Sequence, residues 1–377
     1  MLATHDKCTG CGACACVCPN AAITMERDSE GFTVPFVGDY CDRCGLCGTV
    51  CPELAAVPRR KAPEEVFAVW CNDEEDRLAS SSGGFFRILS REILGAGGAV
   101  FGAAFRAGFE LKHRCGRSEE ECRGFSGSKY LQSNTSGVYR EVAALLEAKA
   151  QTLFSGTPCQ VAGLYGYLRG DCKSLITCDL VCTGVPSPTV FRDYLTGLEK
   201  RFGCKAIQVH FRDKSGKRPR FTVRFADCRI YSKELYSTDF GYGFGAAMFL
   251  RKSCGSCRYA DDRRVGDFTL GDFWGLKVPH DTSKGVSLVM ANSEKGRALM
   301  STLPPVFTSV PRELFEAVAG NARLENPVKH SPKRAEFFDA YTKLPFDRAV
   351  QEIMPSKTRR LAGKIYRVTK SRIGGAT

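Results

Sequence analysis

Apolar side chains between residues 66 and 325 recur at two spacings, which predict that helices and strands alternate there. The segment 85–94 carries apolar residues every three or four positions, the spacing that places them on one face of a helix. The glycines at 95, 97 and 98 end this pattern, and the apolar run 99–105 after them predicts a strand. By the same criteria we expect helices at 138–149, 161–168 and 190–201, and strands at 152–154, 175–181, 206–211 and 220–225. The expected fold class is therefore α+β, a mixed αβ arrangement.

The first 57 residues contain a cysteine motif that occurs twice. The run Cys8-x2-Cys11-x2-Cys14-x3-Cys18-Pro returns 33 positions later as Cys41-x2-Cys44-x2-Cys47-x3-Cys51-Pro. This spacing is typical of paired [4Fe–4S] clusters, because three close thiolates bind one cluster and the fourth reaches the other. We therefore assign Cys8, Cys11, Cys14 and Cys51 to one cluster, and Cys18, Cys41, Cys44 and Cys47 to the other.

Zinc and disulfides are the alternatives for these eight cysteines. Zinc modules usually pair two cysteines with two distant ligands, and structural disulfides are rare in a reducing compartment. Both alternatives fit the doubled run less well than clusters do. Cys16 lies outside the spacing, and we expect it to be a packed free thiol.

The composition favours metal or redox chemistry in a cytoplasmic protein. The chain of 377 residues holds 20 cysteines, and its first residues contain no apolar segment typical of a signal peptide. Its longest apolar stretch, 240–250, is shorter than the roughly 20 residues that a membrane span needs. Of the formal net charge of +13, seven cations lie after Pro355 without any acidic residue among them. The body is therefore only mildly basic, and nucleic-acid binding is not expected.

Four cysteines of the αβ region form a second group of candidates. Cys254 and Cys257 make a C-x2-C pair, while Cys159 and Cys182 each follow a predicted strand. Spacing alone leaves three interpretations open, namely a redox dithiol, half of a zinc site and a third iron–sulfur cluster. Structural burial is expected for the cysteines without a motif, which are Cys71, Cys115, Cys122, Cys172, Cys178, Cys204 and Cys228.

Two polar, glycine-bearing loops are candidates for binding a phosphate or a flavin. The segment 80–84 directly precedes the predicted helix, where free N–H groups bind anions, although simple capping explains the same residues. The loop 127–133 holds Lys129, whose cation would stabilise a reduced flavin near its N1 atom. In the segment 266–275, Asp267, Asp272 and Trp274 alternate with apolar residues. They either line a cofactor pocket or are solvated at a strand edge.

Six motifs follow one another in the αβ region: SSSGGFF at 80–86, GSKYLQS at 127–133, SGTPCQVAGL at 155–164, DLVCTGVPSP at 179–188, KSCGSCRYADD at 252–262 and GDFTLGDFWG at 266–275. As a set they resemble the coenzyme F420 hydrogenase/dehydrogenase beta-subunit family. The N-terminal cysteine runs are similar to the bacterial-type two-cluster ferredoxin module, a fusion known within that family. The resemblance implies a flavoprotein with FAD, an αβ fold of its own and a [4Fe–4S] cluster near the flavin.

The resemblance also implies roles for particular residues. Cys159, Cys182, Cys254 and Cys257 become the ligands of a third [4Fe–4S] cluster. The implied FAD contacts are Ser82, Gly83, Gly84, Lys129, Gln132, Ser133 and Thr157. Some members of the family exchange hydride with the deazaflavin coenzyme F420, whereas many bacterial members have no established substrate. The resemblance therefore indicates the cofactors better than the reaction.

The predicted function is that of an iron–sulfur flavoprotein oxidoreductase. Electrons would move between FAD, where coenzyme F420 or another organic substrate gives or takes a hydride, and the [4Fe–4S] clusters or ferredoxin. The alternative is a non-catalytic electron-wiring subunit of a larger redox complex. A redox partner protein is expected in both cases, and no catalytic residue is assigned.

The expected organisation has four parts: a ferredoxin-like domain with two clusters at 1–57, a linker at 58–65, a flavin- and cluster-binding αβ domain at 66–325, and a helical, basic region at 326–377. In the last part, Leu361, Ile365 and Val368 fall on one helix face among the seven cations. This pattern predicts contact with a membrane surface or an acidic partner, and a solvated, frayed end is the alternative.

Overall fold

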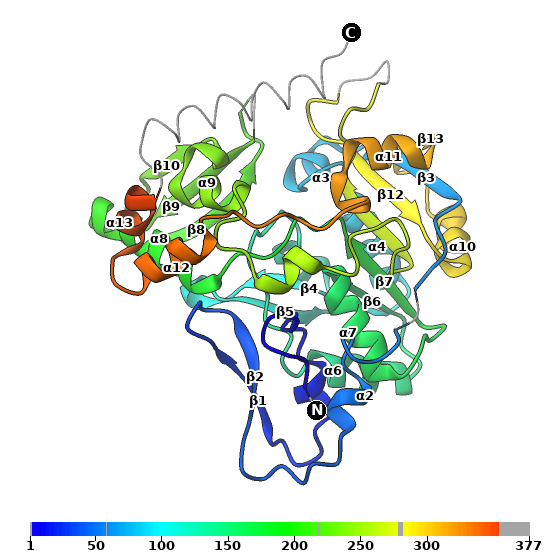
Figure 1. Cartoon of the computed structure of the whole chain (residues 1–377). Coiled ribbons are helices and arrows are strands. Elements are labelled where there is room, and N and C mark those ends of the chain that lie inside the picture. The colour runs from blue at the N-terminus through cyan, green and yellow to red at the C-terminus, as the bar shows by residue number, and fades with distance from the viewer. Residues whose placement is uncertain (1, 58, 217–218, 278–281, 354–377) are drawn as a thin grey trace.

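The computed structural model describes residues 2–57, 59–216, 219–277 and 282–353, which form three sheets with surrounding helices (Figure 1). The N-terminal module, residues 2–57, pairs β1 (Ile23–Arg27) with β2 (Thr33–Val37) and adds the short helices α1 (Ala13–Val17) and α2 (Leu46–Thr49). The other two sheets have eight and three strands. The fold class is mixed α+β, as the apolar spacing predicts.

The eight-stranded sheet has a parallel centre. Its strands, in order across the sheet, are β13 (Phe307–Arg312), β3 (Glu65–Cys71), β12 (Ser287–Ala291), β11 (Phe268–Asp272), β7 (Leu175–Leu180), β6 (Thr152–Gly156), β4 (Ala99–Phe105) and β5 (Leu111–Gly116). The pairs β11–β7, β7–β6 and β6–β4 are parallel, and the remaining pairs are antiparallel. The carboxyl ends of four neighbouring strands therefore lie at one edge of the sheet.

Helices cover both faces of this sheet. Successive side chains of a strand point to opposite faces: Leu153 packs with α4 (Phe85–Gly95) and α10 (Glu294–Thr302), whereas Phe154 packs with α6 (Val138–Glu147) and α7 (Pro158–Leu168). Further along the second face, α11 (Leu314–Gly320) contributes to another apolar cluster. Burial on both faces explains why the central strands are almost continuously apolar. The short helices α3 (Glu74–Ala79) and α5 (Glu119–Cys122) lie in the connections.

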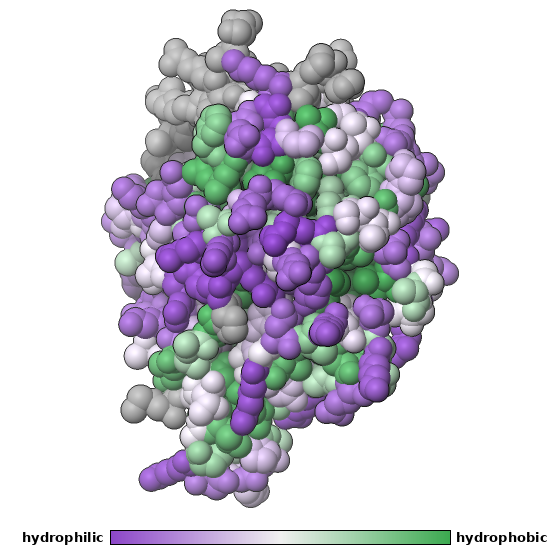
Figure 2. All heavy atoms as spheres, turned by 90° about the vertical axis from the view of Figure 1, so that its right-hand side faces the viewer, coloured by the Kyte–Doolittle hydropathy of each residue, from purple (hydrophilic) through white to green (hydrophobic). Residues whose placement is uncertain are grey.

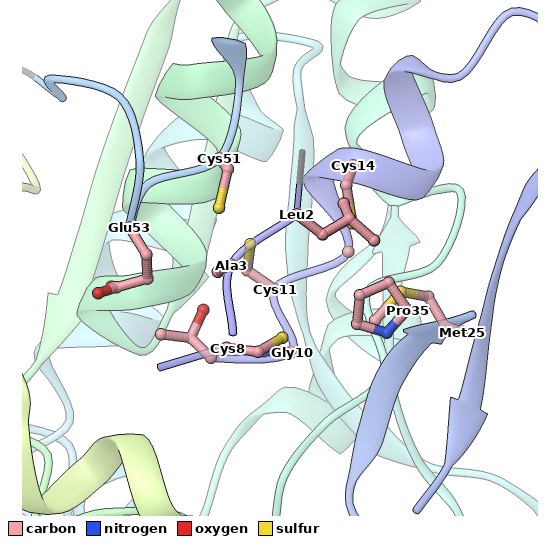
Figure 3. Close-up of a pocket in the computed structure, with 12 residues that line it drawn as sticks. Leu2, Ala3, Cys8, Gly10, Cys11, Cys14, Met25, Pro35, Cys51 and Glu53 are labelled. Carbon is pink, nitrogen blue, oxygen red and sulfur yellow. The ribbon is translucent and has the colours of Figure 1, made fainter. Parts of the chain in front are cut away.

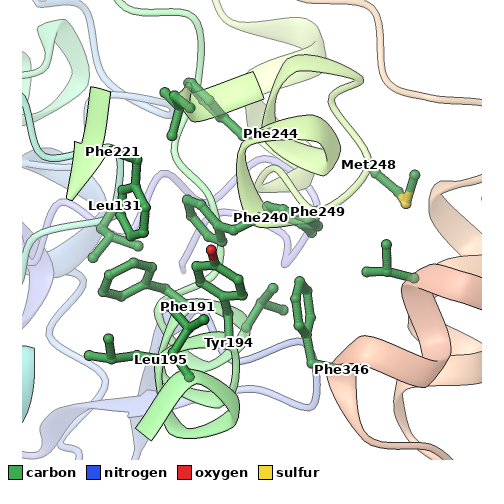
Figure 4. Packing of buried hydrophobic residues seen from close by; sticks show 14 of the residues in the cluster. Leu131, Phe191, Tyr194, Leu195, Phe221, Phe240, Phe244, Met248, Phe249 and Phe346 are labelled. Carbon is green, nitrogen blue, oxygen red and sulfur yellow. The ribbon is translucent and has the colours of Figure 1, made fainter. Parts of the chain in front are cut away.

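The three-stranded sheet has an aromatic core (Figure 4). It contains β8 (Ala206–Asp213), β9 (Arg220–Phe225) and β10 (Ile230–Lys233), packed with α8 (Pro188–Phe202), α9 (Asp239–Gly245), α12 (Arg334–Tyr341) and α13 (Phe346–Ile353). Phe191 meets Phe240 edge-on with ring centroids 5.1 Å apart, and Tyr194 meets Phe346 edge-on at 5.7 Å. Such pairs add about 0.5–1.5 kcal/mol each beyond the burial of their area. They join α8 to α9 and to α13.

The N-terminal module docks on α7 through two glycines. A Cβ atom on Gly163 would lie 2.9 Å from Sγ of Cys11, and one on Gly166 would overlap the carbonyl oxygen of Val50. Both glycines therefore permit a backbone approach that a side chain would prevent. Arg140 of α6 reinforces the contact, because its Nε donates a 2.7 Å hydrogen bond to the carbonyl of Cys16.

Replacing Gly166 with leucine is expected to detach the N-terminal module. The overlap involves backbone at Val50, so it is not relieved by a rotamer change, and overpacking of this kind costs about 1–3 kcal/mol or more. The measurement is limited trypsin digestion at Arg59, Arg60 and Lys61, which should become several-fold faster. The matched control is Gly197→Leu on α8, since nothing lies within 4 Å of a Cβ there. Equal digestion rates for the two variants would contradict the docking argument.

The predicted elements are present with small differences at their ends. The largest is in α7, which begins at Pro158 instead of residue 161, because Thr157 and Gln160 form a capping box and proline occupies the first turn. The strands β1, β2, β3, β5, β10, β12 and β13 are additional to those predicted. The structure also contains the 3-10 helices η1 (Ala107–Phe109), η2 (Arg123–Phe125), η3 (Leu235–Ser237), η4 (Lys252–Ser256) and η5 (Ala322–Leu324).

Two expectations about membranes concern different parts of the chain. Among the described helices, none combines the length and the apolarity that a membrane crossing requires. The basic segment with Leu361, Ile365 and Val368 lies outside the described residues.

Candidate functional site

Cys8, Cys11, Cys14 and Cys51 line one cavity, the grouping that the spacing predicts (Figure 3). The cavity measures about 340 Å³ with the open space at its mouth, and we call it the inner cavity. Gly10 and Gly12 turn the chain between these cysteines with φ values of 67° and 77°, which glycine adopts without strain. Burial raises the pKa of Cys14 to about 12, and the neighbouring Cys8 and Cys51 contribute to this rise. A thiol with so high a pKa loses its proton readily only where positive charge, such as that of iron, compensates it.

The second predicted set, Cys18, Cys41, Cys44 and Cys47, lies nearer the surface. Cys44 is exposed and the other three are half-buried. Hydrogen bonds close the surrounding loops: the amide of Gly38 donates to the carbonyl of Ala22 at 2.8 Å, and the amide of Ala22 points at Sγ of Cys18 at 3.3 Å. Asp42 accepts from the amide of Cys44 at 3.1 Å. The two sets of the module therefore differ in burial.

Cys159, Cys182, Cys254 and Cys257 line a second, larger cavity of about 590 Å³, again counted with its mouth. We call it the αβ cavity. Cys159 lies in the first turn of α7, after β6, and Cys182 follows β7 by two residues. Because β6 and β7 are parallel neighbours, both thiols lie at the same edge of the sheet, where these strands end.

The C-x2-C pair reaches this cavity through a short antiparallel pairing. The amide of Arg251 donates to the carbonyl of Val185 at 3.0 Å, and the amide of Ser187 donates to that of Phe249 at 3.1 Å. These bonds place the loop after Cys182 beside η4, which carries Cys254. Burial raises the pKa of Cys159, Cys182 and Cys254 to about 12 each.

These thiols are not arranged around a single ion. Within the described residues, no three His, Cys, Asp or Glu side chains converge closely enough to hold one metal ion. The thiolates of a [4Fe–4S] cube each bind a different iron atom, so a cube spreads its ligands further apart.

A buried ionic network fixes the segment that follows Cys257. Arg264 and Asp179 are 1% and 0% exposed and form a 2.9 Å ion pair. Asp179 also accepts hydrogen bonds from the amides of Val265 and Gly266, while Arg264 donates to the carbonyl of Leu180 at 2.9 Å. The network therefore ties the 259–266 segment to the end of β7, two residues before Cys182.

Asp267 belongs to the same core, and neither sequence interpretation of it is correct. It is fully buried because β11 lies between β7 and β12, and it accepts from the amide of Thr177 at 2.8 Å and from Arg60 at 3.1 Å. Asp272 instead pairs with Arg212 at 2.6 Å, and the Arg212 guanidinium lies 5.9 Å from the centroid of the Trp274 ring.

The cysteines outside the motifs follow the expectation of burial only in part. Cys16, Cys71, Cys122 and Cys178 are buried, and Cys115, Cys172 and Cys204 are half-buried. Cys228 is exposed, because it occupies the turn between β9 and β10 with a φ of 68°.

The inner cavity and the αβ cavity are neighbours. Thr9 and Glu53 line both of them. Arg251 lines the αβ cavity, and its Nη1 donates to the carbonyl of Cys8 at 2.7 Å. These three residues are absent from the sequence predictions, because none of them belongs to a ligand pattern.

The predicted flavin contacts fall into two groups. Gln132, Ser133 and Thr157 lie near the αβ cavity: Gln160 donates to the hydroxyl of Ser133 at 2.9 Å and accepts from the amide of Thr157 at 3.0 Å. Gln132 accepts from the amide of Thr33, at the contact with the N-terminal module.

The other group is Ser82, Gly83, Gly84 and Lys129. The amide of Gly83 donates to Ser287 at 2.9 Å, and a hydrogen bond of 2.9 Å between Ser81 and Ser128 joins the two loops. The ammonium of Lys129 donates to three carbonyls of its own loop, and burial lowers its pKa to about 7. The loops 80–84 and 127–133 therefore lie side by side. The ammonium of Lys129, however, already donates its hydrogen bonds to backbone carbonyls.

Lys214 is a further cation at this place, and no sequence motif points to it. Its ammonium donates to the carbonyl of Ser82 at 2.7 Å, and burial lowers its pKa to about 7. Nothing in the local sequence marks it, since it simply follows β8.

Comparisons with known proteins agree with the two cysteine patterns. Residues 150–304 match the family model described as the C terminus of the coenzyme F420 hydrogenase/dehydrogenase beta subunit, and residues 7–55 match that of a 4Fe-4S dicluster domain. No curated protein matches the chain. Among solved structures, a chain of the F420-reducing [NiFe] hydrogenase complex from Methanosarcina barkeri matches with 15% identity and a TM-score of 0.46, covering 78% of this chain and 93% of that one.

Proposed function

We propose an oxidoreductase function for this chain, on the premise that it joins a 4Fe-4S dicluster domain to the C-terminal domain of the coenzyme F420 hydrogenase/dehydrogenase beta-subunit family. Bound FAD would exchange hydride with an organic molecule, and [4Fe–4S] clusters would exchange single electrons with it. The observation that carries the proposal is the pair of adjoining cavities, each lined by four cysteines and sharing Thr9 and Glu53.

The proposed ligands follow the two cavities and, for the second set, the spacing of the cysteines in the sequence. Cys8, Cys11, Cys14 and Cys51 would hold one cluster in the inner cavity. Cys18, Cys41, Cys44 and Cys47 would hold a second cluster at the surface. Cys159, Cys182, Cys254 and Cys257 would hold a third in the αβ cavity. Two buried polar atoms without a hydrogen-bond partner, Oγ1 of Thr9 and Nε of Arg251, support this fit, because both are donors beside residues that would carry negative charge.

The proposed flavin site adjoins the αβ cavity. Gln132, Ser133 and Thr157 would offer polar contacts on the cluster side, and Ser82, Gly83, Gly84 and Lys129 on the other. The substrate would be an organic hydride carrier, with deazaflavin coenzyme F420 as the first candidate. Lys214 would add positive charge beside Ser82, which suits an anionic ligand such as a diphosphate.

A redox partner protein would dock at the N-terminal module. Figure 2 shows apolar side chains at the lower end of the molecule, where this module lies. Its exposed large side chains include Phe36, which is 56% exposed, and Tyr40, which is 84% exposed and precedes Cys41. Aromatic residues at a surface are typical of protein interfaces.

A second function, an electron-wiring subunit without a substrate of its own, is favoured by one observation. The ammonium of Lys129 is occupied by three carbonyls, and Gly83 packs on β12, so part of the proposed flavin site already has partners. Turnover only after stable association with another subunit would support this second function.

Iron, acid-labile sulfide and flavin should be measured per chain on protein purified without oxygen. The proposal predicts about twelve irons and one FAD, because each cube carries four irons. About eight irons with FAD would refute the cluster at the αβ cavity. A folded protein with all its iron but no flavin would refute the FAD-dependent reaction and leave the electron-wiring function.

The substrate is tested separately. Reduced deazaflavin should be oxidised by the purified protein in the presence of an artificial electron acceptor. If the protein holds FAD and does not oxidise the reduced deazaflavin, the deazaflavin is not the substrate. Reduction of another organic acceptor by electrons from ferredoxin is then the reaction to measure.

A further inference from the structure

Arg251 lies between the two cysteine-lined cavities. Its side chain is almost fully buried, with the residue 3% exposed. Nη1 of Arg251 donates to the carbonyl of Cys8, which lines the inner cavity. Arg251 also lines the αβ cavity, together with Cys254. Nη2 donates to the carbonyl of Thr33 and to Oε1 of Gln132.

The charge of Arg251 has no carboxylate partner among the described residues. Two other buried arginines do have one, since Arg264 pairs with Asp179 at 2.9 Å and Arg334 pairs with Glu30. Arg251 instead faces carbonyls, an amide and the ring of Phe32, whose centroid lies 5.1 Å away, and its Nε has no acceptor. A buried cation without an anion is strongly unfavourable, so this position calls for negative charge close by.

The position of the guanidinium is also fixed by its neighbours. A Cβ atom on Gly10 would lie 2.6 Å from Nη2 of Arg251, so only glycine leaves room for the cation there. Arginine stays protonated at any physiological pH, so its charge does not change when electrons arrive. The site therefore offers one constant positive charge to both cavities.

We propose that Arg251 is the shared counter-charge of the clusters in the inner cavity and the αβ cavity and that it raises the reduction potential of both. The inference rests on the proposed function for the presence of the clusters. Each reduction adds one electron and no proton, so the cluster site gains one negative charge, which a nearby fixed cation stabilises. Arg251 is thus a positioning and electrostatic residue that takes no part in the chemistry of the substrate.

The test is a redox titration followed by electron paramagnetic resonance, on the full chain loaded with its clusters. In Arg251→Gln, the ratio of reduced to oxidised cluster at a fixed potential should fall about tenfold or more for the clusters of both cavities, since one charged hydrogen-bonding group is lost. The surface cluster of Cys18, Cys41, Cys44 and Cys47 should keep its ratio and serves as an internal control. Unchanged ratios in an iron-replete variant would overturn the proposal.

Two further variants separate charge from structure. Arg140→Gln also removes hydrogen bonds to carbonyls of the N-terminal module, but Arg140 is exposed, so water screens its charge and the ratios should stay near those of the wild type. Arg251→Lys keeps the charge and should keep the ratios within a few-fold, even if the glutamine variant fails to fold. A tenfold fall in the lysine variant would contradict the role of the charge.

The outcome for the wild type keeps this inference distinct from the proposed function. If the wild-type protein holds about eight irons, the cluster of the αβ cavity is refuted, and the shared role of Arg251 is refuted with it. If it holds about twelve irons but no flavin, the proposed reaction fails, while the titration of Arg251 still decides the inference.

Discussion

Replacing Cys182 with alanine is expected to lower the iron content of the protein from about twelve to about eight atoms per chain. Cys182 lines the αβ cavity with three other cysteines, whereas no cysteine of the N-terminal module lines it. Loss of one ligand should therefore empty this site and leave the other two. The measurement is iron and acid-labile sulfide on anaerobically purified protein, together with transfer of electrons from reduced substrate to ferredoxin, which should fall by orders of magnitude.

The matched control is Cys178→Ala, which lies on β7 four residues before Cys182. Cys178 is fully buried in the apolar core, and burial raises its pKa well above the ordinary value, so it stays a neutral thiol. This variant should keep about twelve irons and lose only some stability, because a small cavity is left. A loss of iron in Cys178→Ala equal to that in Cys182→Ala would show that the effect of Cys182 comes from misfolding.

The largest effect on stability is expected for Asp179→Ala. This change leaves the guanidinium of Arg264 buried without its partner and frees the amides of Val265 and Gly266. Removing one partner of a buried pair costs about 3–5 kcal/mol. Urea unfolding followed by circular dichroism should show a much lower midpoint, and the αβ cavity should lose its iron as well, since the network orients the segment after Cys257.

An exposed ion pair provides the comparison. Lys343 and Asp339 lie one helical turn apart and are both about two-thirds exposed. Lys343→Ala should cost roughly 0.5 kcal/mol or less, because water screens such pairs. If Asp179→Ala costs no more than this, the network does not hold the site together.

The four cysteines that line the inner cavity could be predicted as one group from the sequence. In paired runs of this spacing, the fourth cysteine of each run binds the cluster of the other run. This rule alone groups Cys51 with Cys8, Cys11 and Cys14. Ligand spacing is a local property, so a linear pattern carries it. The helix α4 and the strand β4 were predictable for a similar reason, since their apolar residues follow a local period.

The αβ cavity was less accessible to such reasoning. Cys159 and Cys182 meet because β6 and β7 are parallel neighbours, and the C-x2-C pair joins them through the pairing of Val185 with Arg251. A local pattern does not contain strand order or long-range pairing. The sequence alone therefore left a third cluster as one of three interpretations for these cysteines, and the resemblance to a family favoured it. The burial of the Arg251 guanidinium without a carboxylate partner among the described residues is likewise visible only in the folded chain.

Asp267 shows how a local pattern misleads. It alternates with apolar residues as a strand edge would, yet β12 pairs on the far side of β11 and removes the edge. The carboxylate is then stabilised by the amide and hydroxyl of Thr177. The missing information was the position of β12, which returns to the sheet from a later part of the chain.

The docking of the N-terminal module on α7 also closes one side of the αβ cavity. Thr9 and Glu53 belong to this module and line the αβ cavity. At Gly163 and Gly166, the module packs directly against the backbone of α7. A cluster bound in the αβ cavity, as we propose, would be enclosed on one side by this module. Opening of the module would therefore expose that cluster to solvent, although none of its four proposed cysteine ligands belongs to the module.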